Sequence, residues 1–299
     1  MTNVDKEKLR GVGKVLGEAI LMAKGMVKPG VKLITVADAA EKFLRDKNYG
    51  IAFPMNISVN EQAAHYTPCL DDDKVFTNAD LVKIDFGAEK DGFLGDCAVT
   101  IDLSGKYGGL VSAANEALAK AISVVKAGVT VNEIGKAIAE SIESKGYSPI
   151  KNLGGHGINE HELHAEPFIP NYDNGDETEL EEGMVIALEP FATTGKGFVA
   201  DSDIREIFSY VGEGTTRSAD SRLLLKEIST KYTTEPFAAR WLSNKINSRF
   251  RLYAAMGELM RAGAITPHST LVEVSNGMVS QAEAQLIVEK EGCALLTKL

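Results

Sequence analysis

The sequence predicts a fold of the α+β class, in which blocks of helix alternate with blocks of antiparallel strand. Three observations support this prediction: a repeated pair of amphipathic helices, a β-rich hairpin around Asp91-Gly92, and short apolar strands later in the chain. Helices and antiparallel strands in separate blocks are typical of this class. With 299 residues, the chain can form one large domain or two ordinary ones.

The helix pair recurs at a constant offset of 98 residues. The matches are Lys28–Val31 with Lys126–Val129, Val36 with Ile134, Leu44 with Ile142, and Tyr49 with Tyr147. Each copy predicts a helix, a Gly-Val turn and a second amphipathic helix followed by extended chain. The alternative is that two unrelated helix pairs look alike, which the constant register disfavours. We therefore expect a pseudo-two-fold repeat, with a functional site where the halves meet.

The β-rich hairpin carries two acidic residues on one face. Its two-residue turn at Asp91-Gly92 predicts that Asp85 pairs with Ala98 and Asp96 with Gly87. The two aspartates then lie diagonally, with Cβ atoms roughly 7 Å apart. Two buried carboxylates at such a short distance cost much free energy unless a cation lies between them. The hairpin therefore predicts a site for a hard divalent metal. The alternative is an exposed hairpin with solvated acids.

Three later residues stand in positions typical of metal ligands. His156 is framed by glycines, Glu189 ends an apolar strand, and Glu283 shares the alternation of the last β-rich segment. Singly, each is also consistent with a turn or a solvated polar group. The combined set is Asp85, Asp96, His156, Glu189 and Glu283. Four carboxylates and one imidazole can hold two divalent ions about 3.5–4 Å apart, with Mn, Fe, Co and Zn as candidates.

In order and spacing, these residues resemble the methionine aminopeptidases, which belong to the pita-bread metallopeptidases together with creatinase and prolidase. The motifs are Phe53-Pro54, Asn60–Pro68 with His65, Lys83–Gly87, Gly95-Asp96, Gly155-His156, Leu163–Ala165, Ile186–Phe191 and Gln281–Glu283. The match covers nearly the whole chain. It implies a pita-bread fold around an antiparallel sheet and removal of the N-terminal methionine from nascent proteins and peptides.

The stretch between the Glu189 and Glu283 strands is similar to the helical, winged-helix-like insertion of the type 2, archaeal-like members. We expect a catalytic domain over 1–215 and 266–299, and an insertion over 216–265. Helices are predicted over 220–231, from Pro236 through Ile246, and over 251–261. Residues 217–265 contain nine Lys/Arg and four Asp/Glu. We expect this subdomain to wall the pocket, and the alternative is a contact with the ribosome or nucleic acid.

The resemblance also implies a role for each site residue. Two divalent metals would share a bridging water or hydroxide that attacks the first peptide carbonyl, with Glu189 as ligand and general base. His164 would stabilise the oxyanion, and His65 would hydrogen-bond the substrate backbone or the leaving nitrogen. His161 and His268 are interpreted as surface residues.

An apolar slot formed by Phe53, Pro54 and Leu163 would accept the unbranched methionine side chain. The sequence departs from the family pattern at Glu166-Pro167, where a glycine is usual, and at Ala282 and Ala284, which flank the last acid. These departures leave the five ligand candidates in place and affect the expected shape of the pocket.

Composition excludes several other classes. No apolar run approaches the roughly 20 residues needed to cross a bilayer, and the N-terminus lacks a signal-peptide pattern. Three cysteines without CxxC favour a reducing cytoplasm, and a net charge of -10 disfavours nucleic-acid binding by the whole chain. We expect a cytoplasmic enzyme without membrane contact, a monomer by default. The rivals are a prolidase-like enzyme, a pita-bread binding module without catalysis, and a nucleic-acid-binding regulator.

Overall fold

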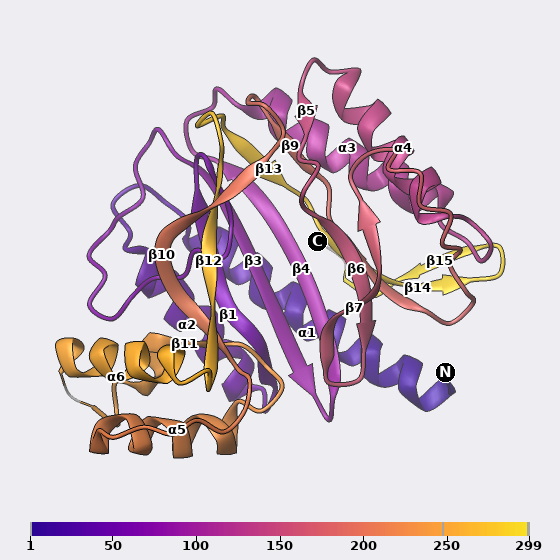
Figure 1. Ribbon diagram of the computed structural model, residues 1–299. Helices are drawn as coiled ribbons and strands as arrows, with labels where there is room; N and C mark the ends of the chain where they lie inside the picture. Colours follow the sequence, from indigo (N-terminus) through magenta and orange to yellow (C-terminus); the bar gives the residue numbers. More distant parts are fainter. Residues whose placement is uncertain (1, 247, 298–299) are drawn as a thin grey trace.

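A computed structural model describes residues 2–246 and 248–297 and places helices around antiparallel sheets (Figure 1). The helices are α1 (Asn3–Met26), α2 (Leu33–Asp46), α3 (Gly108–Val124), α4 (Val131–Glu143), α5 (Ala219–Lys231), the 3-10 helix η1 (Ala239–Leu242) and α6 (Arg249–Arg261). Helices and antiparallel strands occur in separate blocks along the chain, so the α+β prediction is confirmed.

The strands form four sheets with antiparallel pairing. The first contains β1 (Gly50–Val59), β3 (Leu81–Lys90) and β4 (Phe93–Asp102). The second has the order β11 (Phe237–Ala238), β10 (Val199–Tyr210), β12 (Ile265–Glu273) and β2 (Gln62–Ala64). The third has the order β13 (Val279–Gln281), β9 (Phe191–Thr193) and β5 (Ser148–Pro149). The fourth has the order β15 (Gly292–Leu295), β14 (Ala284–Glu289), β8 (Val185–Leu188), β6 (Gly154–Asn159) and β7 (Glu162–Pro170).

The predicted repeat is confirmed by the helix boundaries. The first helix of each pair ends at Met26 or Val124, and the second begins at Leu33 or Val131, both at the offset of 98. The glycine of each connecting turn has a positive φ, 84° at Gly30 and 83° at Gly128, a conformation that glycine adopts without steric cost.

Each helix pair covers its own part of the β structure. Helix α1 packs on β3 and β4, whereas α3 packs on β9 and β13, and α4 on β5 and β7. Equivalent apolar positions are fully buried in both halves, as at Val36 and Ile134. Burial of such a side chain contributes about 1.5–3 kcal/mol, so the repeated apolar pattern holds each helix pair against its sheet.

The predicted hairpin register is also confirmed. Asp85 pairs with Ala98 and Gly87 pairs with Asp96 across β3 and β4. Asp91 and Gly92 both have positive φ, as a tight two-residue turn of this kind requires. The turn therefore places both aspartates on one face of the sheet.

Two of the three helices predicted in the 216–265 segment are present, as α5 and α6. The helix predicted from Pro236 through Ile246 is wrong, because Phe237 and Ala238 are extended and pair with β10. Only the short η1 follows. Phe237 is fully buried in a separate core formed mainly by α5, η1 and α6. Helices α5 and α6 lie together at the lower left of Figure 1. The division of the chain at 216 and 265 stays a prediction. Among the described residues, no helix is long and apolar enough to cross a membrane.

Candidate metal centre

The five candidate ligands come from both halves of the chain. Asp85 and Asp96 lie on β3 and β4, His156 lies on β6, Glu189 directly follows β8, and Glu283 stands between β13 and β14. The backbone N–H of Glu283 donates to the carbonyl of Ala98 at 3.1 Å, which ties the last ligand candidate to the hairpin. The site therefore forms where the two repeats meet.

The glycines around His156 allow the neighbouring strands to approach. A Cβ at Gly155 would collide with the backbone of Ala187 in β8, and one at Gly157 would collide with the backbone of Glu166 in β7. The strands on either side of β6 can therefore pack closely only because Gly155 and Gly157 have no side chain. This close packing brings the His156 ring to the carboxylates.

The ligand atoms fall into two groups that share one residue. Asp96, His156 and Glu283 each offer an atom within 4.8 Å of the other two, and so do Asp85, Glu189 and Glu283. A carboxylate has two oxygens, so Glu283 can serve both groups. The two groups together offer the oxygen and imidazole donors that divalent cations bind.

Hydrogen bonds orient several of these groups. Gln281 Nε2 donates to Asp85 Oδ2 at 3.2 Å and to Glu189 Oε1 at 2.6 Å. His156 Nδ1 lies 3.0 Å from the carbonyl oxygen of Gly157, and its Nε2 lies 3.5 Å from Asp96 Oδ2. A backbone contact at Nδ1 fixes the ring so that Nε2 can bind a metal. Sequence reasoning did not give Gln281 this role, although its alternation with Glu283 placed it on the same face.

Three buried carboxylate oxygens have no hydrogen-bond partner among the described residues. They are Asp85 Oδ1, Asp96 Oδ1 and Glu283 Oε2. Burial, and then the charge of Asp96, raise the pKa of Asp85 to about 8. Burial and the neighbouring carboxylates also raise the pKa of Glu189 and of Glu283 well above the ordinary value.

The acids thus disfavour one another's ionisation in the absence of a cation. No Lys or Arg side chain is among the described residues that line the site. Burial opposes the charged form of His156, but its contact with Asp96 outweighs burial and raises its pKa. Oxygen atoms without partners, uncompensated charge and an oxygen-plus-imidazole donor set all fit a divalent cation.

The cluster opens into a cavity of about 330 Å³. Its apolar wall is formed by Phe53, Leu153, Leu163, Phe168, Phe191, Ile207 and Pro236. The pairing of β1 with β3 shifts between Phe53 and Asn56, and both side chains face the cavity. Pro54 is buried but does not line it. Of the three residues predicted to form the methionine slot, Phe53 and Leu163 thus line the cavity, and Pro54 lies behind its wall.

One of the sequence departures lies next to this cavity. The pairing of β6 with β7 is shifted next to His156, so that Glu166-Pro167 forms a bulge and Phe168 faces the cavity mouth with 42% of its surface exposed. Ala282 and Ala284 are buried and do not line the cavity. Of these departures, the bulge is thus the one that lies next to a residue of the cavity wall.

Besides the ligand candidate His156, three other histidines line the cavity: His65, His164 and His268. His65 is half-buried, and burial followed by the charges of His268 and His164 lowers its pKa to about 4. Partial removal from water, followed by the charge of His156, also lowers the pKa of His164 to about 4. Part of this side chain remains exposed to solvent. At neutral pH both rings are therefore uncharged, and each has one N–H to donate.

The prediction that His268 is a surface residue is wrong. Its ring lies edge-on to His65 with centroids 6.0 Å apart, its Nε2 is 2.7 Å from Ser209 Oγ, and it lines the cavity. Strand β12 brings it there by pairing with β10 and β2, which no local pattern indicates. His161 is exposed, as predicted, with 52% of its side chain accessible.

A buried carboxylate–imidazole cluster beside an apolar cavity, at the junction of a duplicated α+β fold, defines a metal-dependent enzyme. Residues 7–221 match the model of metallopeptidase family M24, and the chain belongs to this family. As a member of the M24 metallopeptidases, the chain uses divalent metal ions.

Curated relatives narrow the assignment. The methionine aminopeptidase of Archaeoglobus fulgidus is 44% identical over 98% of this chain and 98% of its own length. That of Pyrococcus horikoshii is 42% identical over 99% of this chain and 100% of its own. The expected membership among archaeal-type methionine aminopeptidases, and with it the enzyme class, is confirmed.

Solved structures confirm the pita-bread fold. Methionine aminopeptidase from Thermotoga maritima superposes with a TM-score of 0.73 at 25% identity, and the match covers 100% of this chain and 98% of that one. A thermophilic Arx1 gives a TM-score of 0.84 at 16% identity, covering 99% and 91%, which is a likeness of fold alone.

Proposed function

We propose that this chain removes the N-terminal methionine from peptides and nascent proteins, using a hydroxide generated at a pair of divalent ions. The observation that carries the proposal is the sharing of Glu283 between two ligand groups, Asp96–His156–Glu283 and Asp85–Glu189–Glu283. When bound, the ions supply a nucleophile at neutral pH and polarise the peptide carbonyl. Co, Mn, Fe and Zn all suit this donor set.

Glu189 is proposed as general base as well as ligand. It closes one ligand group, and burial and the neighbouring acids raise its pKa, which makes the carboxylate a stronger base. Its Oε1 accepts a hydrogen bond from Gln281, which holds the carboxylate in one orientation.

His164 and His65 are proposed to contact the reacting peptide. Their uncharged rings line the cavity beside the acids, and each can donate an N–H without repelling a cation. His164 is assigned to the oxygen on which negative charge develops, because it lies beside His156 with ring centroids 4.6 Å apart. His65 is assigned to the substrate backbone or the leaving nitrogen.

Phe53 and Leu163 are proposed to hold the methionine side chain. The thioether chain is unbranched and flexible, and so suits an apolar slot of this kind.

Pro236, from the 216–265 segment, also lines the cavity, which supports the interpretation that this segment walls the pocket. We propose 216–265 as the insertion of a catalytic domain that spans 1–215 and 266–299. Free cysteines suit a reducing compartment, so we place the activity on nascent chains in the cytoplasm.

The test is hydrolysis of Met-Ala-Ser by the purified chain before and after chelation, with metal content measured in parallel. We expect turnover with two ions per chain, loss of turnover on chelation, and recovery when Mn²⁺ or Co²⁺ is returned. N-acetyl-Met-Ala-Ser is the matched control, because it lacks the free amine that a metal-dependent aminopeptidase would recognise. Turnover that survives complete metal removal would overturn the proposal, and preferential cleavage of Xaa-Pro peptides would favour a prolidase-like activity.

A further inference from the structure

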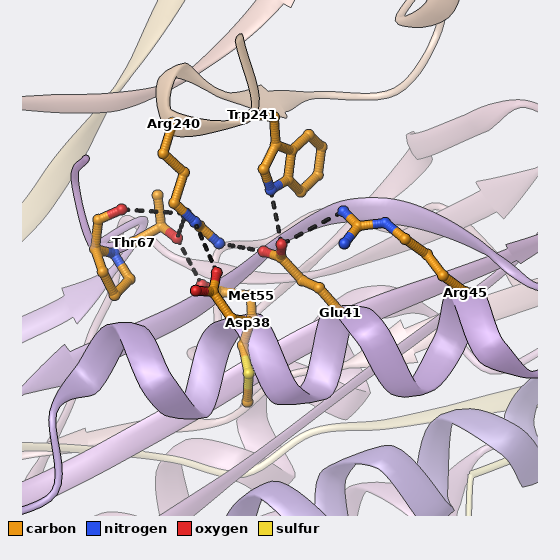
Figure 2. A network of polar contacts seen from close by, with 8 residues as sticks. Asp38, Glu41, Arg45, Met55, Thr67, Arg240 and Trp241 are labelled. Atoms are coloured by element: carbon orange, nitrogen blue, oxygen red, sulfur yellow. Dashed lines mark hydrogen bonds and ion pairs between the residues drawn. The ribbon is translucent and has the colours of Figure 1, made fainter. Parts of the chain in front are cut away.

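A buried ion pair joins the 216–265 segment to the first helix pair, apart from the metal centre (Figure 2). Arg240, in η1, and Glu41, in α2, form a hydrogen-bonded pair with side chains 4% and 2% exposed. Trp241 Nε1 donates to the other Glu41 oxygen at 2.7 Å, and Arg45 lies 3.5 Å from it. Two residues of η1 thus hold one carboxylate of α2.

The same guanidinium reaches the segment that carries His65. Arg240 Nη1 donates to Thr67 Oγ1 at 2.7 Å and to the carbonyl of Pro68 at 3.2 Å. The Thr67 hydroxyl in turn donates to the carbonyl of Met55 at 2.8 Å and is fully buried. Figure 2 shows Arg240 between Thr67 on one side and Glu41 on the other. Thr67 lies only two residues after His65, so this contact holds the chain next to a cavity histidine.

The backbone at His65 needs such support. Its φ of 64° lies in the left-handed region, which costs a non-glycine residue free energy that neighbouring contacts can offset. The backbone N–H of Ile57 donates to the carbonyl of Tyr66 at 2.6 Å, and Thr270 Oγ1 donates to the carbonyl of His65 at 3.2 Å. The Arg240 contacts clamp the following residues, where the loop leaves the cavity.

We propose that Arg240, paired with Glu41, is a positioning residue that fixes the loop presenting His65 to the substrate. Replacing a buried ion pair by apolar residues of similar volume often leaves the stability of a protein unchanged or increases it. The planar guanidinium, by contrast, fixes the positions of the groups that accept its hydrogen bonds. A displacement of 1 Å near reacting atoms can cost about 100-fold in rate. The inference rests on the proposed function, because His65 affects turnover only if it meets the peptide.

Thr67→Val tests the proposal without breaking the ion pair. The substitution keeps the shape of the side chain and removes the hydroxyl that links Arg240 to Met55. We expect kcat on Met-Ala-Ser to fall at least about tenfold with a smaller change in KM, and Mn²⁺ affinity by calorimetry to stay unchanged. Thr67→Ser keeps the hydroxyl and should restore kcat. The matched control is Asp220→Asn, which breaks an exposed ion pair with Arg251 in the same segment and should leave kcat unchanged.

A double-mutant cycle separates positioning from general stabilisation. If Thr67 acts through His65, the kcat loss caused by Thr67→Val should disappear in the His65→Ala background. An equal loss in both backgrounds, or a wild-type kcat for Thr67→Val, would overturn the proposal. Amide hydrogen exchange over residues 64–70 of the metal-free chain should rise in Thr67→Val and not in Asp220→Asn. Since exchange needs no turnover, it tests the loop even if wild-type enzyme fails to cleave Met-Ala-Ser, a failure that would count against the proposed function alone.

Discussion

Replacing Asp85 by Asn should stabilise the metal-free chain while it weakens metal binding. Asp85 is buried, and burial and Asp96 raise its pKa from 3.8 to about 8. Because the pKa of the folded state is raised, the stabilisation by this group is fully present below pH 3.8 and is lost as the pH rises to about 8. At 1.36 kcal/mol per pKa unit, ionising Asp85 costs several kcal/mol at pH 8 and only about 1–2 kcal/mol at pH 5.

Asn is isosteric with Asp and carries no charge, so this cost disappears. Its Oδ1 can still accept the hydrogen bond that Gln281 Nε2 donates to Asp85 at 3.2 Å. In chelator, urea unfolding should therefore give Asp85→Asn a higher free energy of unfolding than wild type, with a larger difference at pH 8 than at pH 5. With Mn²⁺ at 100 times its dissociation constant, wild type should gain about 2.7 kcal/mol per site, a gain that the variant should lose in part.

Asp102→Asn is the matched control on the partner strand β4. Burial acts against its ionisation, but hydrogen bonds from Ser104 and from the backbone of Tyr107 outweigh burial and lower its pKa. This carboxylate therefore stabilises the fold above pH 3.8, and the control should be less stable than wild type at pH 8. An Asp85→Asn variant that is less stable than wild type at pH 8 in chelator, or that Mn²⁺ stabilises as fully as wild type, would refute the reasoning.

Three other substitutions probe the proposed roles. Asp96→Asn should lose metal and Met-Ala-Ser turnover together, because Asp96 closes one ligand group; calorimetry with Mn²⁺ that matches wild type would contradict this. His164→Ala should keep its metal and lose about 10²–10³-fold in kcat, as removal of one oxyanion donor does, and wild-type kinetics would remove His164 from the mechanism. Leu163→Ala should enlarge the apolar slot, so that Phe-Ala-Ser is cleaved better relative to Met-Ala-Ser; an unchanged ratio of kcat/KM values would show that Leu163 does not set the selectivity.

Local sequence signals predicted the elements that local physics controls. The Asp-Gly turn fixes the register of β3 and β4 because a two-residue loop leaves one pairing, and that register puts Asp85 and Asp96 on one face. The repeated helix pairs start and end where their glycine turns and apolar spacing indicate. Prediction failed where pairing is distant: Phe237 is extended because it pairs with Phe208 in β10, against a helical pattern.

The sequence by itself determined the duplicated helix pairs, the hairpin and the residue types that can bind a metal. Turns and amphipathic helices depend on residues only a few positions apart, so local sequence is sufficient to predict them. Only the tertiary structure decided that Glu283 belongs to both ligand groups, that Gln281 joins Asp85 to Glu189, and that His268 faces the cavity. The two Gln281 hydrogen bonds join residues that are 92 and 196 positions apart. Such distant contacts depend on the packing of the whole chain.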